Sequence, residues 1–120
     1  MPLNMIHTMD GIYAMFYTGT VGSGHAIVIL RNGVLAGADA LGGIYDGSFE
    51  LLADGSLDVD VSLRFPPGTL LVSGDTVGPN GLNEDFKCNL PSDLGGGDPL
   101  LLHMPFGPVN FLFQRLRSTI

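Results

Sequence analysis

Short apolar runs separated by glycine fill the first half of the chain. Residues 10–52 read DGIYAMFYTGTVGSGHAIVILRNGVLAGADALGGIYDGSFELL. No segment of the chain keeps a helical apolar period of 3.6 residues over about ten residues. The 18 glycines and 8 prolines disfavour helices throughout. The sequence therefore predicts a fold that is almost entirely β.

The clearest strand signal is LDVDVSLR, residues 57–64, in which apolar and polar side chains alternate. A period of two is typical of a strand with one buried face. The same reasoning predicts further strands over residues 11–17, 24–31, 34–39, 44–52, 70–73, 84–90, 99–104 and 109–116. Residues 65–68 and 77–82 interrupt the strand spacing and predict irregular turns or one short helix.

Two dipeptides, Asn32-Gly33 and Asp54-Gly55, stand between consecutive predicted strands, and such pairs tolerate the positive φ of tight hairpin turns. Many short strands in a small chain must stack as a sandwich or close into a barrel, and consecutive hairpins favour closure. We therefore expect an all-β fold, a small up-and-down antiparallel β-barrel of about eight strands with at most one short helix. Residues 1–9 form a tail that need not be ordered, and residues 10–120 form one domain.

Glycines inside the predicted strands have a structural interpretation. Gly37 and Gly47 would let a small sheet bend sharply or bulge, as a tight barrel requires. The run GTVGSG, residues 19–24, resembles a phosphate-binding loop, but such a loop leads into a helix. Here it leads into a predicted strand, so the phosphate hypothesis is disfavoured.

Composition restricts the partners and the compartment. The net charge of −7 with only five basic residues argues against direct binding of nucleic acid, which needs clustered Lys and Arg. No apolar run is long enough for a membrane helix, and the first residues lack the pattern of a signal peptide. A single cysteine, Cys88, cannot form an internal disulfide. We expect a cytoplasmic protein.

The sequence offers no constellation for catalysis or metal binding. The three histidines, His7, His25 and His103, lack metal-ligand spacing, so we expect no metal and no cofactor. Asp58, Asp60 and Glu50 alternate with core positions and should face water, where carboxyl groups keep ordinary pKa values. No nucleophile elbow occurs, and Cys88 shares a strand face with apolar residues. We expect that the protein is not an enzyme.

Both faces of the first two predicted strands carry apolar side chains. A barrel wall has one inward face, so the second row is either exposed or covered, and large exposed apolar patches are unusual on monomers. The sequence predicts a homodimer or a partner-binding surface that includes Tyr13, Met15, Ile27 and Ile29. The alternative is a row that is simply half-exposed.

The barrel interior is the second candidate site. The expected inward residues are Phe49, Leu51, Leu57, Val59, Val61, Phe86, Phe111 and Phe113. A barrel of about eight strands either fills its interior with side chains or keeps a cavity for a small molecule. A carrier of a small apolar ligand is therefore the alternative to a protein-binding function.

The order of several motifs resembles the GrlR family. These are DGIYAMFY from Asp10, GHAIVILRNGVLAGADA from Gly24, GIYDGSFE from Gly43, then LDVDVSL and GPVNFLFQRL. The resemblance runs from Asp10 to the end of the chain and is strongest over the first fifty residues. It implies a calycin-like (lipocalin-like) β-barrel with a short helix that forms homodimers and has no known catalysis.

The namesake of that family represses a type III secretion gene island by binding a transcriptional activator. An acidic tetrapeptide on the loop between the fourth and fifth strands is important there. The corresponding loop in this chain, LLADGSLD, holds only Asp54 and Asp58 as acidic docking candidates. The resemblance implies a cytoplasmic regulatory protein that acts through a protein partner, but not the same activator contact.

Overall fold

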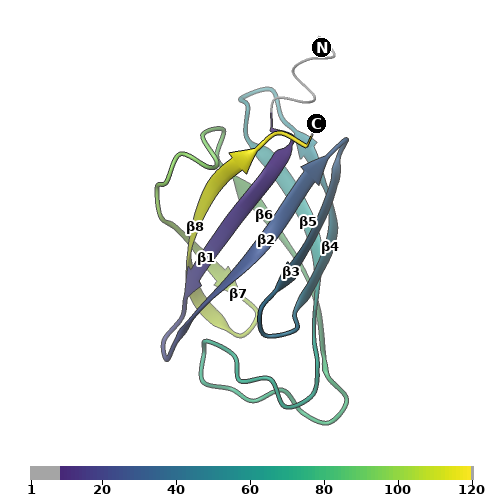
Figure 1. Ribbon diagram of the computed structural model, residues 1–120, viewed down its shortest axis with the longest axis vertical. Coiled ribbons are helices and arrows are strands. Elements are labelled where there is room, and N and C mark those ends of the chain that lie inside the picture. The colour runs from purple at the N-terminus through teal and green to yellow at the C-terminus, as the bar shows by residue number, and fades with distance from the viewer. Residues whose placement is uncertain (1–8, 120) are drawn as a thin grey trace.

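The structure is a computed structural model that describes residues 9–119 and consists of one eight-stranded antiparallel sheet (Figure 1). The strands are β1 (Gly11–Thr18), β2 (Ser23–Arg31), β3 (Val34–Asp39), β4 (Ile44–Leu51), β5 (Leu57–Phe65), β6 (Leu82–Leu90), β7 (Leu100–Met104) and β8 (Gly107–Arg117). No helix occurs within residues 9–119. Met9, at the end of the expected tail, is buried against the core.

The sheet is a nearly closed barrel in which the first and last strands of the chain pair with each other. Strands β1 to β6 form a meander, β7 and β8 form a hairpin, and β8 pairs with β1. In the sheet order β6-β5-β4-β3-β2-β1-β8-β7, the two edge strands are β6 and β7, which are not paired to each other. The predicted small up-and-down β-barrel is confirmed, with one unpaired seam between β6 and β7.

The hairpin between β2 and β3 shows how the sequence fixes the register. Asn32 and Gly33 both have positive φ, 51° and 80°, as a two-residue hairpin turn of this type requires. The turn sets Arg31 opposite Val34 and Leu30 opposite Leu35. Because side chains alternate along a strand, this register sends Leu30 and Leu35 together into the barrel.

The inner wall is apolar along almost its whole length. On β5 every second residue is buried, from Leu57 to Phe65, while Asp58, Asp60 and Arg64 face outward. The predicted inward residues Phe49, Val59, Val61, Phe111 and Phe113 are buried, and Leu51 and Phe86 pack against them half-buried.

Gly37 and Gly47 do not form bulges. Both lie in continuous pairing, and the register shift of β1 against β8 lies elsewhere, between Ile12 and Tyr13. A Cβ atom on Gly37 would lie 2.9 Å from the carbonyl oxygen of Ile27. One on Gly47 would overlap the carbonyl oxygen of Asp60. The two glycines permit close approach of neighbouring strands, which the sharp coiling of a small barrel demands.

The strand predicted over residues 70–73 does not form. Residues 66–81 form a long connection with a single bridge between Leu70 and Thr76, and Gly74 with a φ of 97° turns the chain back. Its apolar residues Leu71, Val72 and Val77 are buried. The backbone N–H of Val21 donates to the carbonyl of Val72 at 2.9 Å. The connection extends beyond one end of the strands and supplies side chains to the core there (Figure 1).

Candidate binding site

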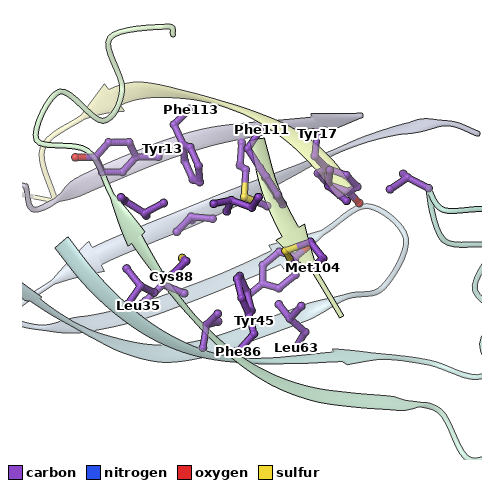
Figure 2. Close-up of a pocket in the computed structure, with 18 of the residues that line it drawn as sticks. Tyr13, Tyr17, Leu35, Tyr45, Leu63, Phe86, Cys88, Met104, Phe111 and Phe113 are labelled. Carbon is purple, nitrogen blue, oxygen red and sulfur yellow. The ribbon is translucent and has the colours of Figure 1, made fainter. Parts of the chain in front are cut away.

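The barrel is not completely filled. A cavity of about 90 Å³ lies inside, lined by side chains from all eight strands and from residues 66–81 (Figure 2). Its wall consists of aliphatic and aromatic side chains, three of them tyrosines, together with two methionines and Cys88. No charged side chain among residues 9–119 lines it. Five of the predicted interior residues take part, namely Val59, Val61, Phe86, Phe111 and Phe113, whereas Phe49, Leu51 and Leu57 belong to the surrounding core.

A buried carboxyl group marks one end of this cavity. Tyr17 and Tyr45, which line the cavity from β1 and β4, both donate their hydroxyl protons to Oδ2 of Asp39, the Tyr45 bond being 2.5 Å long. Oδ1 of Asp39 accepts the backbone N–H of Leu41 at 2.7 Å. Asp39 is only 9% exposed, so these three donors replace the water that a carboxylate normally binds.

Burial and hydrogen bonding keep these tyrosines protonated. Removal from water, and then the hydrogen bond to Asp39, raises the pKa of Tyr17 and of Tyr45 far above the ordinary value. At the other end of the cavity, Tyr13 donates its hydroxyl to the carbonyl of Met9 at 2.7 Å (Figure 2). Burial is also the main cause that raises the pKa of Tyr13.

The inward residues at the seam are less buried than those of β5. The inward residues of β5 are fully buried, but Phe86 and Cys88 on β6 and Leu100 and Leu102 on β7 are only half-buried. Burial, with a smaller contribution from the charge of Asp58, raises the pKa of the Cys88 thiol to about 11.

The outer wall carries an apolar face that includes only two of the four residues predicted for the association surface. Tyr13 and Met15 pair with Val28 and Ala26 and point into the barrel, where they are 1% and 7% exposed. They cannot belong to an outer surface. Ile27 and Ile29 do face outward and are 46% and 39% exposed.

The strand register aligns these two isoleucines with further outward apolar residues. Ala14, Ile27, Ala38 and Ile44 form one row across β1 to β4, and Ile12, Ile29 and Ala36 form the next. We call these two rows, together with Phe16 and Val34, the outer apolar face. Phe16 and Val34 are exposed at its margins.

The outer wall next to this face, on β4 to β6, is polar and acidic. Outward residues of β4 to β6 include Asp46, Asp60 and Asp85, and exposed ion pairs join Arg64 to Asp46 at 2.8 Å and Lys87 to Asp60 at 3.7 Å. Neither pair adds much stability at such exposure.

The two acidic docking candidates are not on one loop. Asp54 lies in the β4–β5 turn, where hydrogen bonds from Ser56 hold its pKa below the ordinary value. Asp58 lies within β5 and accepts a hydrogen bond from the side chain of Asn89 at 3.1 Å. The two carboxylates therefore belong to different local structures, and they do not form a single acidic loop.

The sequence did not indicate the role of Asp39, which marks only the end of a predicted strand. Alternation along β3 could have indicated it, because Asp39 lies four residues after Leu35 and two after Gly37, on the inward row of the strand. Within residues 9–119, no group of three or more His, Cys, Asp or Glu side chains is placed to hold a metal ion.

The fold and the cavity define a small up-and-down β-barrel with a hollow apolar interior. No known protein family and no curated protein matches this chain. The part of the chain that the structure describes contains no helix long and apolar enough to span a bilayer.

Proposed function

We propose that the protein is a non-enzymatic binding protein that holds a small apolar ligand inside the barrel. The cavity of about 90 Å³ carries this proposal, because it is apolar almost throughout and enclosed by the sheet. Water does not bind stably in an apolar space of this kind, since a buried water molecule needs several polar partners. Each buried CH₂ group of a ligand would contribute about 0.8 kcal/mol.

Ligand uptake can be measured with hexanol as probe. Native mass spectrometry of the purified protein is expected to show a bound hexanol molecule, and thermal denaturation is expected to shift upward. The stabilisation reaches about 2.7 kcal/mol when free ligand is about 100 times the Kd. Val61→Phe places a ring in the cavity and should abolish both effects.

A matched change outside the cavity separates cavity filling from general damage. Val21 is 66% exposed and does not line the cavity, so Val21→Phe should leave hexanol uptake unchanged. If hexanol fails to bind the native chain, or binds Val61→Phe equally well, the interior is not a ligand site.

A second function is favoured by the outer apolar face. Exposed apolar patches of this extent commonly mark interfaces. We propose that two copies associate through this face as a homodimer. The chain has a net charge of −7, and outward acidic residues lie on β4 to β6 beside this face. The residues of the outer apolar face carry no charge, so two copies repel least when they meet through it.

Replacing Ile29 with glutamate is expected to convert the dimer to monomer. A charge at the centre of an apolar interface should weaken association by about 30-fold or more, the effect of losing one hot spot. Size-exclusion chromatography with light scattering measures the mass in solution. Asn83→Glu, on exposed β6, serves as the control that stays dimeric. A dimer that persists in Ile29→Glu would exclude this interface.

The resemblance to the GrlR family supports a regulatory role for this face in the cytoplasm. Such a protein would act by binding a protein partner, with a transcriptional regulator as the class that the resemblance implies. Co-purification from cells with native protein and with Ile29→Glu tests this role. A specific partner that Ile29→Glu loses would support it, and the absence of any specific partner would count against it.

A further inference from the structure

The long connection between β5 and β6, residues 66–81, covers one end of the barrel (Figure 1). Leu71 and Val72 of this connection are buried and line the cavity. Leu41, in the β3–β4 turn at the same end of the strands, also lines the cavity and is 44% exposed. The cavity therefore reaches this end of the barrel, where the connection lies between it and the solvent.

The connection is bonded mainly to itself. Three backbone hydrogen bonds of 2.8 Å join its two halves, from Gly68 to Val77, from Leu71 to Asp75 and from Val77 to Thr69, with the N–H donor named first. Among the described residues, a single backbone hydrogen bond ties it to the rest of the barrel, from the N–H of Val21 to the carbonyl of Val72 at 2.9 Å. The remaining attachment is apolar, through the buried side chains, so the connection can move as one unit.

Glycines near both ends of the connection suit them to act as hinges. Gly68 and Gly81 have φ angles of 81° and 75°, in the region that glycine adopts without strain. Because glycine has no Cβ atom, it can also pass into conformations that other residues avoid. Large changes of backbone angle are therefore available on both sides of the unit, as hinged closure requires.

We propose that residues 66–81 form a lid, hinged at Gly68 and Gly81, whose opening admits the ligand to the barrel interior. This inference rests on the proposed ligand-binding function and adds the route of entry. Leu71 and Val72 belong to the cavity wall when the lid is closed, so a ligand that fills the cavity contacts the lid itself. A bound ligand therefore favours the closed lid, and its exchange with solvent requires the lid to open.

A disulfide between the lid and the β1–β2 turn tests this route. A Cβ atom on Gly74 would lie 3.8 Å from Cβ of Val21, the usual separation in a disulfide. In the double variant Val21→Cys/Gly74→Cys, oxidation should hold the lid closed and slow both entry and exit of hexanol by about 10-fold or more. NMR exchange spectroscopy of hexanol measures these rates. Because both rates fall together, the Kd should stay the same.

The reduced form of the same double variant is the matched control. Gly74 has a φ of 97°, which strains any other residue, and this strain is present in both forms. Dithiothreitol should therefore restore fast exchange of hexanol. Peptide mass spectrometry verifies that the disulfide joins residues 21 and 74 and does not include Cys88.

A change in the β1–β2 turn should have the opposite effect and serves if the double variant does not fold. A Cβ atom on Gly19 would lie 2.6 Å from both Cγ2 and the carbonyl oxygen of Val72, so Gly19→Ala should displace the lid. Hexanol should then enter about 5-fold faster or more. Gly22→Ala, in the same turn, is the matched control, because a methyl group there would meet no atom within 4 Å.

Hydrogen exchange of the Val21 amide reports lid opening without a ligand, because this N–H bonds to the lid. It should exchange about 10-fold faster in Gly19→Ala than in Gly22→Ala. The amide of Gly19, which bonds to Gly22 within the turn, is the internal reference. Its exchange should be similar in the two variants.

The outcomes distinguish the lid from the ligand site. If hexanol does not bind the native chain, the ligand-binding function is wrong, and the route of entry fails with it. If hexanol binds but exchanges equally fast in the oxidised and reduced forms, the route is wrong while the ligand site remains. Equal exchange of the Val21 amide in Gly19→Ala and Gly22→Ala would also overturn the lid.

Discussion

Replacing Gly47 with alanine is expected to destabilise the barrel by about 3 kcal/mol or more, the upper range for added volume in a packed core. A Cβ atom at this position would overlap the carbonyl oxygen of Asp60 and lie 2.9 Å from Cα of Val61. These are backbone atoms of β5 and cannot rotate away as a side chain would. To accept one methyl group, β4 and β5 would have to separate.

Urea denaturation followed by far-ultraviolet circular dichroism measures this loss. Gly22→Ala is the matched control, because a methyl group on Gly22 would have no neighbouring atom within 4 Å and the residue does not have a positive φ. It should change the free energy of unfolding by less than about 1 kcal/mol. Equal stability of Gly47→Ala and Gly22→Ala would show that β4 and β5 do not approach as closely as described.

The folded protein is expected to show less tyrosinate than the unfolded chain at a pH of about 10. The chain has three tyrosines and no tryptophan, and burial raises the pKa of all three above the ordinary value of 10.0. In the unfolded chain the same residues are half ionised at that pH. Near-ultraviolet absorbance of tyrosinate, measured with and without urea, should therefore differ between the two states.

The same shifts predict that stability falls in alkaline solution. A group whose pKa is raised in the folded state stabilises the fold fully below its unfolded pKa, and that contribution is lost as the pH rises toward the folded pKa. For Cys88 the loss begins near pH 9.0 and continues to about 11, and for the tyrosines it begins near 10.0. Ionisation of Tyr17 and Tyr45 should therefore coincide with unfolding. A native protein that forms as much tyrosinate at pH 10.0 as the unfolded chain, while its circular dichroism stays unchanged, would contradict the buried positions.

Local patterns were sufficient to predict the strands and much of the interior. The alternation in residues 57–64 identified Val59 and Val61 as inward, because the opposite row contains aspartates. The Asn32-Gly33 pair predicted a hairpin that the positive φ angles confirm. In both cases a few adjacent residues carry the whole signal.

The side of β1 that faces inward could not be read from β1 alone. Both of its rows are apolar, so alternation does not distinguish them, and the prediction that Tyr13 and Met15 face outward is wrong. The decision comes from pairing, since Tyr13 lies opposite Val28 and Met15 opposite Ala26. On β2 the outward row contains His25 and Arg31, a polarity that the sequence does display.

The hydrogen-bonded group of Tyr17, Asp39 and Tyr45 could not be predicted for a different reason. Tyr17, Asp39 and Tyr45 lie on three strands, and their contact depends on the register of three hairpins together with the curvature of the sheet. The short apolar run at residues 70–73 resembles a strand because length and composition alone do not separate a strand from a buried loop. Its role in covering the core is a property of the whole barrel.

Pairing of β1 with β8 has a consequence for how the chain acquires its shape. The contacts between these two strands join residues from opposite ends of the sequence, such as Tyr13 and Arg115, whereas β2 to β6 pair only with sequence neighbours. During synthesis the early strands can associate first, but their inward apolar side chains remain exposed to solvent until β8 has been synthesised. Pairing of β8 with β1 is thus the slow, non-local step of folding, and the nascent chain is most exposed to aggregation just before it.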